Sequence, residues 1–191
     1  MEKVLMSCIM SLFLCLSPSN LHAIQPDLTN EEIEEAIKYG EKNSRTIFKT
    51  LLILPACLEA WPGLDSGLVR SKFVDLAVKA ARKKRHNQKI TEDEIKEASA
   101  SETLEVLIRT RDDVAIKLIQ RDKMIEPVSI SYLDHHCEWC DFYGGEASKE
   151  THEYVIASFP YLEIIPNTIT TVIVWDGGYE NQYEINLSRF K

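Results

Sequence analysis

After its first 23 residues the sequence lacks any apolar run that is long enough to cross a membrane. No later segment approaches the uninterrupted apolar length of about 18 residues that marks a candidate transmembrane helix. The sequence also lacks a basic excess, because 22 Lys and Arg residues stand against 30 Asp and Glu residues, a formal net charge of −8. Nucleic acids and anionic lipids bind basic surfaces. We therefore expect neither class of partner, and no transmembrane segment after residue 23.

The motifs of the common enzyme classes are missing as well. The sequence has no Gly-x-Ser-x-Gly, no glycine-rich phosphate-binding loop and no His-Glu-x-x-His, the patterns typical of hydrolases, nucleotide-binding enzymes and zinc proteases. The acidic pairs Glu31-Glu32 and Asp112-Asp113 fall at a helix start and at a turn, where acidic side chains are expected without catalysis. We predict no catalytic residue, and the sequence favours a protein that is not an enzyme.

The first 23 residues have the three zones of a secretory signal peptide. Lys3 supplies a short positive zone, residues 4–16 are mainly apolar, and a polar stretch ends in Leu-His-Ala at Ala23. An apolar zone of about 13 residues is too short to span a hydrocarbon core of roughly 30 Å, and a small residue at Ala23 suits signal peptidase. We expect residues 1–23 to be removed and the protein to be exported, either periplasmic or secreted.

Two capping boxes predict helix starts in the region from residue 24 to residue 101. Thr29 is followed by Glu32, and Thr91 is followed by Glu94. At this spacing each side chain can bond the backbone N–H of the other residue. We predict one helix that begins after Thr29 and ends near residues 40–43, and a short one that begins after Thr91.

Two further helical runs are predicted between these boxes. Residues 45–54 form the first, which Pro55 must end or kink because proline has no backbone donor. Residues 67–86 form the second, because apolar residues recur there at helical spacing, at Val69, Phe73, Leu76, Ala77 and Ala80. The cations at residues 82–86 suit the negative end of a helix dipole, and we favour this interpretation over a phosphate-binding patch.

After residue 101 the pattern changes to the period of two that is typical of strands. Strands are predicted at residues 104–109, 114–119, 127–133, 153–157, 168–175 and 179–187, with a hairpin turn at Asp176-Gly177-Gly178. Helices first and strands second predict an α+β fold. In this fold an N-terminal helical segment (residues 24–101) packs with a C-terminal antiparallel immunoglobulin-like β-sandwich (residues 102–191).

One polar segment concentrates groups that bind metals or react. Residues 134–141 contain two imidazoles and two thiols, the ligands that zinc and copper prefer: His135, His136, Cys137 and Cys140. Three hypotheses remain open. They are a local Cys137–Cys140 disulfide, favoured by an oxidising compartment, a metal site that His152 would extend, and a redox-active dithiol. We predict no cofactor, with zinc or copper as the alternative.

Loss of residues 1–23 removes Cys8 and Cys15 and leaves an odd number of cysteines. The third remaining cysteine is Cys57, within the apolar run of residues 51–58. A free cysteine commonly packs as a small hydrophobic side chain, and we predict this role for Cys57. A bridge to Cys137 or Cys140 is the alternative.

Two parts of the sequence resemble a loosely defined group of bacterial exported proteins of unknown function. The first is Val-Arg-Ser-Lys-Phe-Val-Asp-Leu-Ala at residues 69–77 with Ile-Thr-Glu-Asp-Glu at residues 90–94. The second comprises Phe-Pro at residues 159–160, Ile-Pro at 165–166 and Ile-Asn-Leu-Ser at 185–188. The resemblance implies a helical N-terminal part and a C-terminal β-sandwich-like part, and it supplies no activity.

These observations lead to two hypotheses about function. The first is a non-enzymatic envelope or secreted protein that binds an unidentified protein or envelope partner, since immunoglobulin-like folds often serve recognition by analogy. The second is a zinc- or copper-binding protein that uses Cys137 and Cys140 with His135 or His136.

Overall fold

The structure is a computed structural model of the 191-residue chain, and it describes residues 26–50, 52–59, 66–110, 114–133, 153–176 and 178–190. Over these residues the fold is mixed α+β, with three α-helices and two antiparallel sheets. The helices are α1 (Asn30–Lys42), α2 (Lys72–Arg85) and α3 (Glu92–Ala100). This confirms the α+β class that the order of helical and strand patterns predicts.

Both predicted capping boxes are present and set the starts of α1 and α3. The Glu32 carboxylate accepts from the Thr29 backbone N–H at 2.8 Å, and Thr29 Oγ1 accepts from the Glu32 N–H at 3.2 Å. Thr91 and Glu94 repeat the arrangement at 2.9 and 3.3 Å. These bonds satisfy backbone donors that the first turn of a helix otherwise leaves without partners.

The strands form two antiparallel sheets. Sheet A has the order β1-β2-β3-β7-β6, and sheet B has the order β5-β4-β8-β9. Sheet A consists of β1 (Cys57–Leu58), β2 (Gly67–Arg70), β3 (Thr103–Thr110), β7 (Glu153–Pro160) and β6 (Ser129–Leu133). Sheet B consists of β5 (Lys123–Ile125), β4 (Val114–Gln120), β8 (Ile169–Asp176) and β9 (Tyr179–Asn186).

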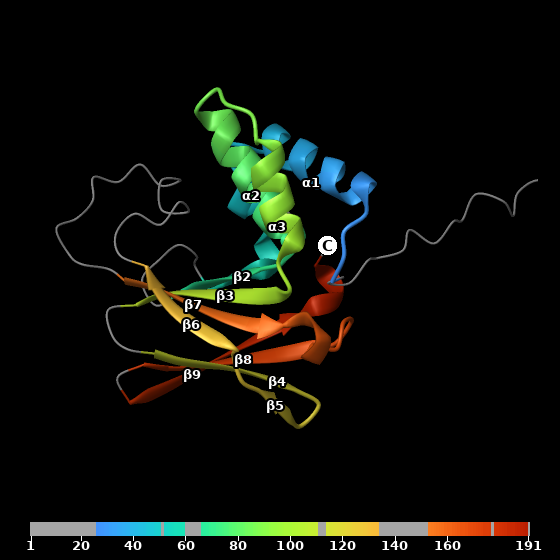
Figure 1. Cartoon of the computed structure of the whole chain (residues 1–191). Coiled ribbons are helices and arrows are strands. Elements are labelled where there is room, and N and C mark those ends of the chain that lie inside the picture. The colour runs from blue at the N-terminus through green and yellow to red at the C-terminus, as the bar shows by residue number, and fades with distance from the viewer. Residues whose placement is uncertain are drawn as a thin grey trace, which may run out of the picture.

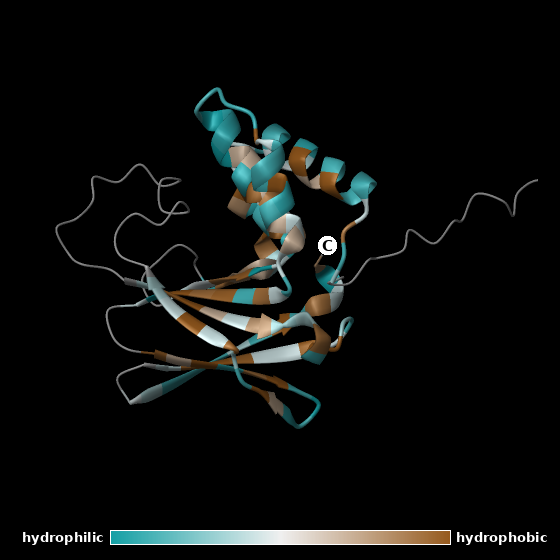
Figure 2. Ribbon diagram, viewed as in Figure 1, coloured by the Kyte–Doolittle hydropathy of each residue, from teal (hydrophilic) through white to brown (hydrophobic). Residues whose placement is uncertain are grey.

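Sheet A is the middle layer of the molecule. The three helices lie over one of its faces, and sheet B lies beneath the other (Figure 1). Because both faces are covered, the consecutive residues Val106, Leu107 and Ile108 of β3 are all buried. The apolar colouring accordingly concentrates in the strands and on the inner sides of the helices (Figure 2).

Single 3₁₀ turns connect or end several of these elements. They are η1 (Ile47–Lys49), η2 (Leu54–Ala56), η4 (Tyr161–Glu163) and η5 (Leu187–Arg189). The helix predicted for residues 45–54 is therefore wrong. The β-branched Thr46, Ile47 and Thr50 disfavour a helix, and the chain instead buries Ile47, Phe48 and Ile53.

The start of the helix predicted for residues 67–86 is also wrong. Residues 67–70 form β2, which pairs with β3, and α2 begins only after Ser71. The Ser71 hydroxyl accepts from the Val74 backbone N–H at 3.3 Å, so Ser71 is the N-cap of α2. The basic residues 82–85 lie in the last turn of α2, as the dipole argument predicts.

The helical and β parts of the chain are not cleanly separated at residue 102. Strands β1 and β2 belong to the sequence before residue 102, yet they extend sheet A beside β3.

Within the described ranges no helix has both the length and the apolar character needed to cross a membrane.

Candidate functional site: a charged cleft between α2, α3 and β3

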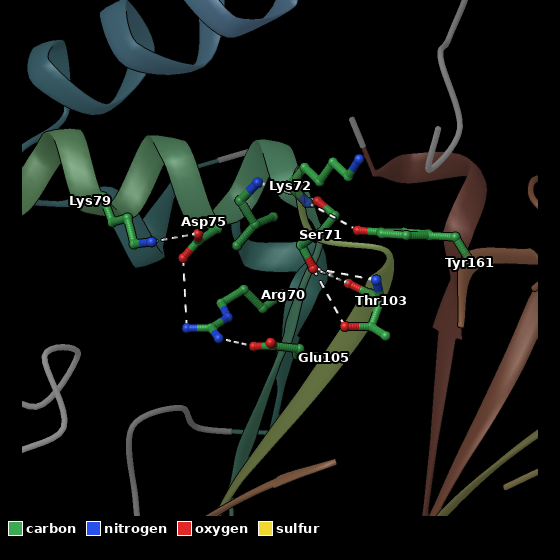
Figure 3. Close-up of polar contacts among 10 residues, drawn as sticks. Arg70, Ser71, Lys72, Asp75, Lys79, Thr103, Glu105 and Tyr161 are labelled. Atoms are coloured by element: carbon green, nitrogen blue, oxygen red, sulfur yellow. Dashed lines mark hydrogen bonds and ion pairs between the residues drawn. The ribbon is translucent and has the colours of Figure 1, made fainter. Parts of the chain in front are cut away.

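A polar cleft with a volume of about 200 Å³ opens where α2, α3 and β3 meet. Charged side chains from all three of these elements and from the end of β2 line it. Its lining includes Arg70, Asp75, Lys79, Glu97, Ser101 and Glu105. Several of them point toward one another across the junction of the helix and the sheet (Figure 3).

The pairing of β2 with β3 brings the first two charges together. Arg70 is the last residue of β2, and its register partner on β3 is Glu105. Directly opposite residues of an antiparallel pair project from the same face of the sheet. This face is the one that the helices cover, so Arg70 and Glu105 both lie beneath α2.

The helix α2 supplies the other two charges of the cluster. Asp75 and Lys79 are four residues apart, which places them on one side of the helix, and their Oδ2 and Nζ atoms lie 3.0 Å apart. Asp75 Oδ1 lies 3.7 Å from Nη1 of Arg70, and Nη2 of Arg70 forms an ion pair with Glu105 Oε2. A chain of alternating charges therefore runs from β3 through β2 to α2 (Figure 3).

These four side chains are largely withdrawn from solvent. The exposed fractions of the side chains of Asp75, Arg70 and Glu105 are 12, 17 and 21%. At this burial, charges interact more strongly than they do in water. The ion pairs therefore hold the side chains of the cleft in one arrangement.

Two buried carboxylate oxygens in this cluster accept no hydrogen bond from the residues that the structure describes. They are Oδ1 of Asp75 and Oε2 of Glu105. Glu105 Oε2 is compensated by direct ion-pair contact with Arg70 Nη2, whereas Asp75 Oδ1 lies 3.7 Å from Arg70 Nη1. A buried acceptor without a hydrogen bond costs about 1–3 kcal/mol. Asp75 Oδ1 has the looser of the two contacts, at 3.7 Å, so it has most to gain from an incoming donor.

Lys72, which lines the cleft at the start of α2, contacts Tyr161, which lies outside the cleft lining. The backbone N–H of Lys72 donates to the Tyr161 hydroxyl at 3.2 Å. Burial raises the pKa of Tyr161 well above its ordinary value, so this phenol stays protonated. The Lys72 ammonium donates to the Pro26 carbonyl oxygen and lies 3.7 Å from the Asp27 carboxylate. Lys72 therefore ties residues 26–27 to the start of α2.

The metal or disulfide site predicted from sequence lies outside the described residues. His135, His136, Cys137, Cys140 and His152 all fall between the end of β6 at Leu133 and the start of β7 at Glu153. Among the residues that the structure does describe, no three His, Cys, Asp or Glu side chains form a group that could hold a metal. The metal, disulfide and dithiol hypotheses for this segment stay predictions.

Cys57, the cysteine that the described residues include, is a free thiol. It is half-buried and packs against the hydrophobic core. Its Sγ lies 3.6 Å from the Ile53 carbonyl oxygen, and burial raises the pKa of the thiol to about 12. A thiol of this kind is a poor nucleophile at neutral pH, because the thiolate is the reactive form. The position agrees with the predicted role as a small hydrophobic side chain.

No family model, no curated protein and no solved structure matches this chain. The resemblance to bacterial exported proteins of unknown function therefore stays a prediction.

Sequence reasoning missed the cleft because its residues carry no motif. The pattern of residues 67–86 predicts one helix that contains both Arg70 and Asp75, and it does not reveal the change from strand to helix at Ser71. One signal was present: Glu105 stands between the apolar Leu104 and Val106 within a strongly apolar strand. A charge inside such a strand needs a partner when it is buried. The sequence therefore indicates an ion pair at Glu105, but it does not identify Arg70 as the partner.

Proposed function

We propose that this chain is an exported, non-enzymatic binding protein whose cleft between α2, α3 and β3 binds a small ligand that carries a cationic N–H donor. The observation that carries the proposal is the buried Oδ1 of Asp75, which lines the cleft and accepts no hydrogen bond within the described residues. An amine or a guanidine is the ligand class that supplies both a donor and a positive charge.

The size and charge of the cleft support a ligand with the dimensions of an amino acid. A volume of 200 Å³ equals about seven water molecules, at roughly 30 Å³ each. Lys79 and Ser101 also line the cleft, and Lys79 Nζ lies 3.0 Å from Asp75 Oδ2, so a ligand held at Asp75 Oδ1 meets a cation and a hydroxyl close by. The ion pairs of Arg70 with Asp75 and Glu105 order the site in advance, which reduces the entropy lost on binding.

The location of the protein and the finer description of its fold are part of the same proposal. Export rests on the signal-peptide pattern of residues 1–23. The two stacked sheets support a β-sandwich of the immunoglobulin-like kind, although β1 and β2 extend sheet A beyond the strands expected after residue 101. An envelope or secreted protein partner remains a second proposal, for which this architecture offers support by analogy.

Calorimetry with defined probes tests the cleft. The probes are L-arginine, L-lysine, agmatine and putrescine, with acetate and glutarate as acidic comparisons. We expect at least one cationic probe to bind and to raise the unfolding temperature, and we expect the Asp75→Asn variant to lose this response. Asp122→Asn, in the exposed turn between β4 and β5, is the matched control and should respond as the wild type does.

Two outcomes would contradict the proposal. One is that no cationic probe binds, or that the acids bind as tightly as the amines do. The other is that Asp75→Asn binds the cationic probe with unchanged affinity while its circular dichroism spectrum shows that it is folded.

A further inference from the structure

Among the described strands, β6 lies at an edge of sheet A, and exposed apolar side chains occur directly before it, at Val128, and within it, at Ile130 and Tyr132. In sheet A its hydrogen-bonded neighbour is β7, on one side of the strand. The exposed fractions of Val128, Ile130 and Tyr132 are 64, 40 and 48%. Neither proline nor a charged residue occurs from Val128 to Leu133. Backbone N–H and C=O groups on the outer side of such a strand can pair with a further strand.

The other edges of the two sheets carry features that discourage pairing. Strand β1 has two residues, and β5 has three and begins with the exposed Lys123. Strand β9 carries the exposed Glu180 and Glu184. Short length and charged side chains are the usual means by which proteins protect a sheet edge. Strand β6 has neither feature, so it differs from every other edge of the described sheets.

We propose that β6 is a self-association edge, at which two copies of this chain pair their β6 strands in antiparallel fashion around a two-fold axis through Ile130. The sequence Val-Ser-Ile-Ser-Tyr at residues 128–132 is symmetric in chemical class about its centre. Antiparallel pairing about Ile130 therefore places Ile130 opposite itself and Val128 opposite Tyr132. It also places Ser129 opposite Ser131. A two-fold interface requires this kind of self-complementary surface.

The charge distribution makes the proposed self-association depend on the salt concentration. Each copy has a formal net charge of −8, so two copies repel each other at long range, but the paired strand itself carries no charge. The nearest acidic residue before it, Glu126, is neutralised by Lys117 at 2.6 Å. Salt reduces the Debye length to about 8 Å at 0.15 M, so the dimer should be weaker at low ionic strength.

Ile130 and Tyr132 lie on the sheet face that meets sheet B. Their register partners on β7 are Ala157 and Val155, which pair in turn with Val106 and Ile108 of β3. A second β6 strand would extend sheet A and cover the side chains that are exposed at this side of the molecule. The inference is independent of the ligand proposed for the cleft, because none of the residues that line the cleft belongs to β6.

The test measures the mass of the full purified protein by light scattering and sedimentation across the micromolar range, at about 0.01 and 0.15 M salt. We expect a monomer–dimer equilibrium in which the dimer is stronger at the higher salt concentration. Ile130→Lys should be monomeric throughout with an unchanged circular dichroism spectrum. The control Leu162→Lys changes an apolar residue that is 97% exposed on η4, and it should dimerise as the wild type does.

A crosslinking variant keeps the proposal testable if Ile130→Lys does not fold. On a two-fold axis through residue 130, Ile130→Cys should form a disulfide between two copies, detected as a 130–130 linked peptide, faster than Leu162→Cys does. Three results would overturn the proposal: a wild-type monomer at every concentration, a dimer that Ile130→Lys leaves intact, or no preference for the 130–130 link. A monomer that instead binds an extended peptide at β6 would likewise overturn self-association and assign the edge to another partner.

Discussion

The α-carbon of Gly40 in α1 lies so close to the backbone carbonyl oxygen of Ala77 in α2 that a Cβ atom at position 40 would overlap it. Both residues are buried, and the contact lies where α1 crosses α2. Glycine is normally unfavourable inside a helix, by about 1 kcal/mol relative to alanine. Here the absence of a side chain is what allows the two helices to approach.

Gly40→Ala is therefore expected to destabilise the protein, against the direction of helix propensity. Overpacking of this kind costs about 1–3 kcal/mol, more than the propensity gain when the backbone cannot move. Urea denaturation followed by circular dichroism measures the change. Lys38→Ala, at an exposed position of α1, is the control and should change stability little. A Gly40→Ala protein as stable as the wild type would mean that the helices are not in close contact.

Removal of the Arg70 side chain should destabilise the folded protein more than removal of either carboxylate that Arg70 pairs with. Arg70→Met leaves Glu105 and Asp75 as buried acids that lack their shared cation, and breaking a buried pair in this way costs about 3 kcal/mol. Thermal unfolding measures the loss, and Arg121→Met, at an exposed turn, is the control. Adding Glu105→Leu to Arg70→Met should recover part of the stability, because it removes one uncompensated charge. A double variant no more stable than Arg70→Met would count against this account.

Glu94 should make the stability of the protein depend on pH in the acidic range. Its partial burial alone would raise its pKa, but hydrogen bonds from Lys83 and Thr91 lower the pKa from 4.5 to about 2. The carboxylate therefore stabilises the folded state above pH 4.5, and this contribution is lost as the pH falls toward 2. The unfolding free energies of wild type and Glu94→Gln should differ at pH 6 and converge near pH 2. If the difference in unfolding free energy did not change with pH, the charge of Glu94 would not contribute to the stability of the protein.

A thiol count on the exported protein separates the hypotheses for residues 135–140. If Cys137 and Cys140 form a disulfide, the denatured protein should react with one equivalent of a thiol reagent before reduction and with three after it. Before denaturation Cys57 should react slowly, because burial raises the pKa of its thiol to about 12. Three reactive thiols before reduction, together with stoichiometric zinc or copper by elemental analysis, would favour the metal-binding alternative. A single fast-reacting thiol in the folded protein would contradict the buried position of Cys57.

Signals that act within a few residues were enough to predict most of the elements. The capping boxes at Thr29 and Thr91 involve bonds across three positions, so the sequence alone marks the starts of α1 and α3. Alternation along residues 104–109 predicts β3, and the Val, Ile and Thr content of residues 168–175 predicts β8, both from local sequence. The same reasoning failed at residues 67–70, where buried apolar residues fit a strand and a helix equally well.

Capping and periodicity depend on near neighbours, so the amino-acid sequence alone was enough for the α+β class, the starts of α1 and α3 and most of the strands. It also supplied the expectations of export and of reactive groups at residues 135–140. The pairing of Arg70 with Glu105 and Asp75, the contact of Gly40 with Ala77 and the edge position of β6 emerge only from the folded chain. Each of these depends on strand register or on helix crossing between distant segments, and no local pattern encodes such a relationship.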